Sequence, residues 1–213
     1  MPQMDVWQVP GFGQHSLVDY QMNMKTSTSA FSAFILALLA GCLTTTPPPQ
    51  SDWNIECSER AACLAETPKF GVAKLALVEV RAPYSVREVA VLRADGSMAF
   101  DQFNMYAASP VQLIKSVSFA ALERSGLFKA VVGSSSSADS DVEIEVAVTK
   151  LALDCREDGV RRAVAEISLR LVRAHAIVGY AKGLGSADAS GANFASSVSD
   201  AVTAAFANAM KKL

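Results

Sequence analysis

The chain has 213 residues, 51% of them apolar and 19% charged, and its formal net charge is −2. So balanced a charge excludes a basic stripe for nucleic acid and gives no excess that would attract an oppositely charged partner. The length is sufficient for one domain with a substantial core.

An apolar run over residues 33–42 is the first informative feature. About ten helical residues rise only ~15 Å, whereas a bilayer core needs roughly twenty residues, so the run fits the h-region of a secretory signal better than a transmembrane helix. Lys25 supplies a positive charge upstream. The tetrad Leu39–Cys42 resembles a bacterial lipobox, in which the cysteine sulfur receives a diacylglycerol before cleavage. The alternatives are an uncleaved anchor and a buried core helix.

This cleavage site divides the chain into four predicted parts. They are an N-terminal extension from a start site placed too early (1–23), a lipoprotein signal peptide (24–41), the lipid anchor and tether (42–69) and a folded domain (70–213). A long cytoplasmic n-region is the alternative for the first part and leaves the site unchanged. Removing Lys25, Asp5 and Asp19 from 19 basic and 21 acidic residues leaves 18 and 19 in the mature chain, a net charge of −1.

Three cysteines remain once Cys42 is assigned to lipid: Cys57, Cys63 and Cys155. Disulfides persist in an oxidising compartment, so one disulfide and one thiol are expected. Pairing Cys155 with Cys57 or Cys63 would join the N-terminal segment to the sheet, and pairing Cys57 with Cys63 is the rival. Their spacing is not a zinc-ligand pattern, and we predict no metal site.

The first half of the domain predicts strands, a hairpin and one helix. An almost continuous apolar run over 72–80 favours a buried strand, and Asp95–Gly96 predicts the tight turn of a hairpin. Ser109 and Pro110 are a typical helix N-cap and first helical residue, and Gly126 suits a left-handed C-terminal cap.

The second half predicts a three-stranded meander and a last helix. Residues 142–148 alternate apolar and polar, and the parity changes near Thr149, which indicates a bulge. Strands over 163–172 and 177–184 follow, with turns at Asp158–Gly159 and near His175. Residues 193–210 carry one alanine-rich apolar face of a helix. The fold class predicted is α+β, with one largely antiparallel sheet and two helices packed on one face.

The opposite face of this sheet is the predicted binding surface. Val164 and Val172 are the binding-face candidates, because they are apolar at positions that alternate with the buried ones. Such a face or edge suits a lipid tail, an extended partner segment or a second copy, which would make a homo-oligomer. The alternative is that residues 103–108 cover it.

No catalytic arrangement is visible. Glu143 and Glu145 fall on the predicted solvent face of a strand, and His175, the sole histidine after Cys42, lies in an apolar stretch where a structural role is expected. No nucleophile is paired with a base. We therefore predict that the protein is not an enzyme and binds no cofactor.

Four segments together carry a family resemblance over residues 70–210. They are Arg93–Gly96, the aromatic stretch to Ala107, the helix start Ser109–Pro110 and residues 125–131. In order and spacing they look like the ABC-type transport auxiliary lipoproteins, which include the paraquat-inducible protein C-like lipoproteins. Where that family often has Trp-Ala-Glu-Pro, this chain has Tyr-Ala-Ala-Ser-Pro, ending at Pro110.

The resemblance implies a non-enzymatic accessory to an ABC transporter whose periplasmic subunit carries mammalian-cell-entry domains. Such systems move lipids between the inner and outer membranes. Leu43 follows the lipidated cysteine, where inner-membrane retention commonly uses Asp, so the resemblance implies an outer-membrane lipoprotein facing the periplasm. The alternative function is an envelope scaffold lipoprotein that activates a cell-wall enzyme or assembles an outer-membrane pore.

Overall fold

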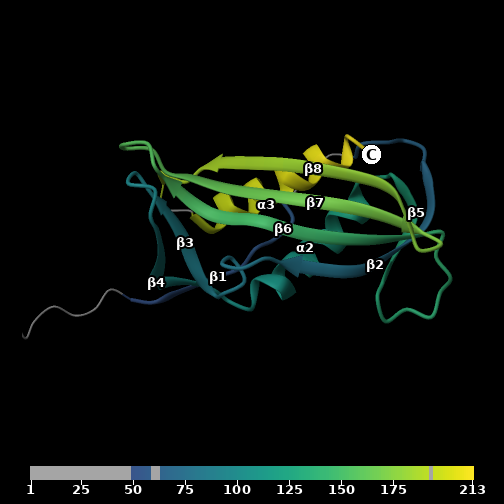
Figure 1. Ribbon diagram of the computed structural model, residues 1–213, viewed down its shortest axis with the longest axis horizontal. Coiled ribbons are helices and arrows are strands. Elements are labelled where there is room, and N and C mark those ends of the chain that lie inside the picture. The colour runs from purple at the N-terminus through teal and green to yellow at the C-terminus, as the bar shows by residue number, and fades with distance from the viewer. Residues whose placement is uncertain (1–48, 59–62, 192–193) are drawn as a thin grey trace, which may run out of the picture. The chain divides into compact units, whose positions relative to one another are not determined.

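The computed structural model describes residues 49–58, 63–191 and 194–213 (Figure 1). The predicted lipobox, with Cys42, lies outside the described residues. Within these residues, two helices and eight strands follow one another in this order: β1 (Ser51–Trp53), β2 (Phe70–Val80), β3 (Glu88–Arg93), β4 (Met98–Tyr106), α2 (Pro110–Arg124), β5 (Phe128–Gly133), β6 (Val142–Cys155), β7 (Arg162–Arg173), β8 (Ala176–Asp188) and α3 (Phe194–Met210).

β6 is the strand around which the sheet is arranged. One of its edges pairs with β7, and β7 pairs in turn with β8. Its other edge pairs first with β2, which pairs in turn with β5. Towards its end the same edge pairs with β3, which pairs with β4, and β4 pairs with β1. The register shifts between Val148 and Lys150, which confirms the bulge predicted near Thr149. Because a bulge bends and twists its strand, β6 can pair with β2 before the bulge and with β3 after it.

The prediction of a largely antiparallel sheet is wrong, because the sheet is mixed. β2 runs parallel to both β5 and β6, β3 runs parallel to β6, and β1 runs parallel to β4. The β3–β4, β6–β7 and β7–β8 pairs are antiparallel. Each antiparallel pair consists of consecutive strands, so a local turn in the sequence predicts it. The parallel pairs join strands that are separated by other elements, and no local turn predicts them.

Local signals in the sequence placed the turns and the helix ends correctly. Ser109 caps α2, and its Oγ accepts a hydrogen bond from the backbone N of Gln112 at 3.4 Å. Gly96, Gly126 and Gly159 all have positive φ, as the predicted turns and cap require. The β7–β8 turn uses Ala174 (φ 46°) and His175 (φ 65°), so two non-glycine residues adopt the left-handed conformation there.

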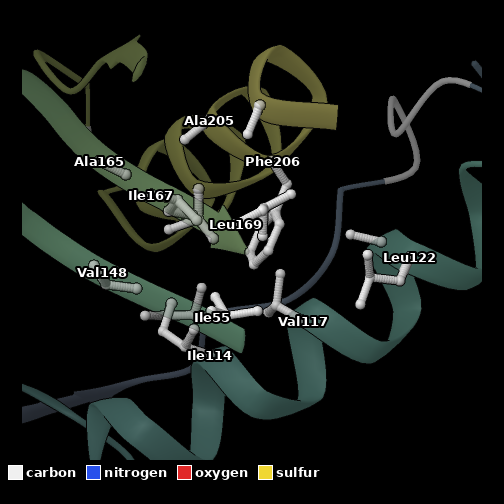
Figure 2. Close-up of a cluster of buried hydrophobic side chains, with 14 of the residues drawn as sticks. Ile55, Ile114, Val117, Leu122, Val148, Ala165, Ile167, Leu169, Ala205 and Phe206 are labelled. Carbon is white, nitrogen blue, oxygen red and sulfur yellow. The ribbon is translucent and has the colours of Figure 1, made fainter. Parts of the chain in front are cut away.

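Both helices lie on one face of the sheet, as predicted (Figure 1). In Figure 2, Ile114 and Val117 of α2 and Phe206 of α3 converge with Ile167 and Leu169 of β7. These side chains are at most 2% exposed, and they form the centre of one continuous core. Of the residues that the structure describes, neither helix is long and apolar enough to cross a membrane.

The folded body begins earlier than the predicted boundary at residue 70. The compact unit starts at Pro49, and β1 pairs with β4. Ile55 is 3% exposed in the core, and the backbone N of Glu56 donates to Ser199 Oγ of α3 at 3.1 Å. Residues 49–58 are therefore part of the domain rather than a tether, because they cover the core between the helices with Ile55 (Figure 2).

Candidate interaction surface

The sheet face opposite the two helices is called the open face here, and β6, β7 and β8 form most of it. Small residues of β8 turn towards α3: Ala181 is 3% exposed in the core, and Gly183 and Gly185 touch the helix backbone. Side chains alternate along a strand, so Tyr180 and Leu184 project from the open face. Ile177 shares that face, because it is in register with Val172.

Four apolar residues form what we call the open-face patch: Val172, Ile177, Tyr180 and Leu184. The last three are 60–64% exposed, which is unusual for large apolar side chains on a regular strand. Val172 is half-buried beside Ile177. The predicted candidate Val172 thus belongs to this patch, on the edge strand of the sheet.

Val164, the second predicted candidate, lies on the same face but away from the patch. It is half-buried and in register with Ala152 of β6 and Ser186 of β8. Ala152 is only 3% exposed, although it belongs to the open face, so this half of the face is partly covered. The structure brings only one of the two predicted residues into the exposed patch.

The segment that approaches the open face is the β2–β3 connection rather than residues 103–108. Its Tyr84 packs against the core, and the pKa of Tyr84 is raised by burial and by the nearby negative charge of Glu166 on β7. Residues 103–106 belong to β4 at the end of the sheet. The alternative in which residues 103–108 cover this face is therefore not supported.

Ion pairs occupy the middle of the open face. Arg170 Nη1 of β7 lies 3.1 Å from Glu145 Oε2 of β6, and both side chains are about one-third exposed. In register with this pair are Leu77 on β2 and Tyr180 on β8, so one row across four strands reads apolar, acidic, basic, apolar. A row of this kind matches a partner that offers both apolar contacts and hydrogen bonds.

Glu166 is the most closely held carboxylate of this face. Lys182 Nζ of β8 lies 2.7 Å from its Oε1, and the Thr149 hydroxyl, at the β6 bulge, donates to the same oxygen. The hydrogen bond from Lys182, and then that from Thr149, holds the pKa of Glu166 below its ordinary value. Glu166 therefore stays ionised and tied to both neighbouring strands, which rigidifies the surface next to Leu184.

Two side chains of the C-terminal helix region bind the outer edge of β8. Asn208 Nδ2 donates to the carbonyl oxygen of Leu184 at 2.9 Å, and Lys212 Nζ donates to that of Lys182 at 2.6 Å. These carbonyls would otherwise be available to an added strand. Strand addition is thus blocked over this half of β8, and partners are directed to the face rather than to the edge.

The structure joins none of Cys57, Cys63 and Cys155 in a disulfide. Cys63 Sγ lies at Gly126, beside the start of β5, whereas Cys155 ends β6. The fourteen residues from Val142 to Cys155 span about 43 Å of strand. Cys63 and Cys155 therefore lie at opposite ends of the sheet and cannot be bridged in this fold. Pairing of Cys57 with Cys63 stays a prediction.

Hollows elsewhere on the described surface offer no comparable arrangement. Two of them, of about 440 and 490 Å³, flank Ser58 along α3 and are lined mainly by small residues together with Asp188 and Asp200. Among the residues that the structure describes, no group of three or more His, Cys, Asp or Glu side chains could hold a metal ion.

Sequence reasoning missed three of the four patch residues, although a signal was present. In β8 the large residues Ile177, Tyr180 and Leu184 occur among the glycines and alanines of residues 176–187. Where a helix approaches a strand closely, the small residues face inwards and the large ones face outwards. This reverses the usual pattern, in which the large apolar residues of a strand point into the core.

No family model matches the sequence, and no curated protein matches it. Several solved structures resemble it. A Xanthomonas campestris protein described under the family name DUF330 is 16% identical with a TM-score of 0.50, over 78% of this chain and 88% of that one. An uncharacterized protein has a TM-score of 0.48 at 13% identity, over 74% and 93% of the two chains.

PelC from Paraburkholderia phytofirmans, crystallised as a dodecamer, has a TM-score of 0.38 at 12% identity, over 79% of this chain and 95% of that one. At these identities the likeness to the DUF330 protein shows the fold alone, and the two weaker matches carry no argument. The resemblance to the paraquat-inducible protein C-like lipoproteins is not confirmed by these comparisons, and family membership stays a prediction.

Proposed function

We propose that this chain is a non-enzymatic lipoprotein of the outer membrane, anchored through Cys42 and facing the periplasm. It acts as the auxiliary component of an ABC transport system whose periplasmic subunit carries mammalian-cell-entry domains and which moves lipids between the two membranes. Its part in that system is to hold a protein partner at the membrane. The sequence resemblance and the lipobox support this proposal.

The observation that carries the binding role is the open-face patch. Ile177, Tyr180 and Leu184 expose large apolar side chains on a rigid sheet, next to the ion pair of Glu145 and Arg170. A lipid tail lying across this face would remove water from paired charges without replacing their hydrogen bonds, which is costly. A protein surface can satisfy both kinds of group, so a protein partner is favoured over a lipid tail.

Crosslinking from the patch tests this proposal. A photoreactive phenylalanine analogue at position 180 should capture the periplasmic mammalian-cell-entry subunit in the native host. The same analogue at Glu123, exposed on α2, is the control and should not capture it. Capture of a cell-wall enzyme or of a pore subunit from position 180 alone would favour the scaffold function instead.

A second experiment tests whether Tyr180 itself contributes to binding of the partner. With the photoreactive group at position 184, the Tyr180→Ser protein should capture less of the partner than the protein that keeps Tyr180, because one large apolar contact is lost. Equal capture from positions 123, 180 and 184 would contradict the proposal, because it would show that the yield reflects proximity in the envelope rather than this surface.

A further inference from the structure

Two exposed aromatic side chains lie on β4, at the opposite end of the domain from β5 (Figure 1). Phe100 is 42% exposed and Phe103 is 43% exposed. They lie outside the open-face patch, which is formed by β7 and β8. Two large aromatic side chains exposed near each other on one strand are candidates for contact with an apolar environment.

Asp101 holds Phe103 in this position. Its Oδ1 accepts hydrogen bonds from the backbone N of Phe103 at 2.9 Å and of Asn104 at 3.2 Å, and its Oδ2 accepts one from Asn104 Nδ2 at 2.7 Å. In the pairing with β3, Val89 is opposite Asp101 but Glu88 is opposite Met105, so residues 102–104 form a bulge. The exposure of Phe103 therefore results from a defined backbone structure.

β1, the first strand that the structure describes, pairs with the strand that carries the two phenylalanines. β1 runs parallel to β4, with Ser51 in register with Asn104. Within the described residues, β1 pairs with β4 only from Asn104 to Tyr106, so the part of β4 that carries both phenylalanines has an uncovered edge.

The predicted lipid anchor is close in sequence. Ser51 is nine positions after Cys42, and a fully extended chain spans about 30 Å over that separation. An acylated Cys42 would therefore keep the β1–β4 end of the domain within that distance of the membrane surface. Apolar and aromatic side chains held there partition into the boundary between headgroups and acyl chains.

We propose that Phe100 and Phe103 insert into the lipid surface beside the anchor and form a second contact that fixes the orientation of the domain on the membrane. The inference rests on the proposed lipidation of Cys42. A single tether lets the domain rotate freely, whereas a tether and an aromatic contact on the same edge hold the sheet in one orientation. The partner surface on β7 and β8 is then presented in a constant direction.

Quenching by brominated phospholipids tests the contact. The acylated full mature protein is reconstituted in phosphatidylethanolamine–phosphatidylglycerol vesicles in which part of the acyl chains is brominated. All variants carry Trp53→Phe, which removes the one tryptophan after Cys42 and keeps an aromatic side chain against Phe194. Phe103→Trp and Phe100→Trp are the probes, and Leu184→Trp is the matched exposed control.

We expect brominated lipid to reduce the fluorescence of the Phe103→Trp and Phe100→Trp proteins and to leave that of the Leu184→Trp protein unchanged. Acylated protein in which neither β4 probe is quenched, or in which all three are quenched equally, would overturn the membrane contact but not the anchor. Mass spectrometry that finds no acyl chain on Cys42 would overturn the anchor and this inference with it.

Discussion

The backbone of Gly183 in β8 lies so close to Ala205 in α3 that a Cβ atom on the glycine would be 1.9 Å from the alanine carbonyl oxygen. Gly185 has the same relationship to Ala201. The alanine-rich face of α3 and the two glycines therefore let helix and strand backbones touch. This contact turns the large residues of β8 outwards and so creates the open-face patch.

Gly183→Ala should accordingly destabilise the protein by about 3 kcal/mol, because the added methyl group meets rigid backbone rather than a flexible side chain. The measurement is the free energy of unfolding from urea titration. Gly133→Ala is the matched control, since Gly133 is also a strand glycine but has open space where the Cβ would stand. Its change should stay within about 0.5 kcal/mol. Similar values for both variants would contradict the close approach.

Acidification should weaken the protein through Glu166. Its pKa is lowered in the folded state by the hydrogen bonds from Lys182 and Thr149. A carboxylate whose folded pKa lies below its unfolded value stabilises the fold above the unfolded pKa, and this contribution is lost as the pH falls through the folded pKa.

Glu166→Gln should therefore lower the free energy of unfolding at pH 7 and differ less from the wild type at pH 3. The comparison of both proteins at the two pH values, by urea titration, measures this. Glu123→Gln, at an exposed position of α2, is the control and should show little effect at either pH. A Glu166→Gln protein that is destabilised equally at both pH values would show that the effect does not come from the charge of Glu166.

Features that depend on neighbouring residues were predictable from the sequence. The Ser109 cap, the Asp95–Gly96 and Asp158–Gly159 turns and the bulge at Thr149 each depend on a few adjacent residues, and the structure has all of them. Both helices were placed on the correct face, because the sheet pattern and the helix pattern each leave only one face apolar.

Features that depend on distant pairing were not predictable. The parallel pairs of β2 join it to strands that follow only after a hairpin and a helix, and no local residue specifies which strand lies beside which. Ile55 was missed because the short segment around it resembles a tether, although Trp53, Ile55 and Cys57 alternate with polar residues as in a strand. The patch on β8 was missed because it depends on how closely α3 approaches.

Tyr106 is buried with an unsatisfied hydroxyl group. It is 2% exposed, burial raises its pKa, and its hydroxyl has no hydrogen-bond partner among the described residues. Tyr106→Phe should raise the free energy of unfolding by about 1 kcal/mol, because a buried polar group without a partner costs free energy. Tyr106→Leu, which also removes ring volume, should lower it. Destabilisation by Tyr106→Phe would indicate that the hydroxyl is hydrogen-bonded in solution.

The lipid anchor has its own test. Cys42→Ala should abolish metabolic labelling with palmitate and leave an unprocessed precursor or a soluble protein, because the sulfur is the predicted attachment atom. Two or three acyl chains anchor firmly, since each buried CH₂ contributes ~0.8 kcal/mol. Cys63→Ala, at an exposed cysteine of the described body, is the control and should remain labelled. Label that persists in the Cys42→Ala protein would contradict the lipobox assignment.

The open face should tolerate charge where the core does not. Val172→Asp is expected to leave the melting temperature nearly unchanged and to impair capture of the partner, whereas Leu169→Asp, in a core position of the same strand, should unfold the protein. Val164→Asp should lower the melting temperature more than Val172→Asp, because its register neighbour Ala152 is buried.

Val172→Lys distinguishes lost apolar surface from charge repulsion. Val172 is in register with Glu143, so an aspartate at this position faces a like charge and a lysine faces an opposite one. Partner capture should fall in both variants if the apolar surface of Val172 is what the partner contacts. Capture that falls with aspartate and survives with lysine would instead assign the effect to electrostatics. A large drop in melting temperature with both substitutions would show that Val172 belongs to the core, and the patch would then be confined to β8.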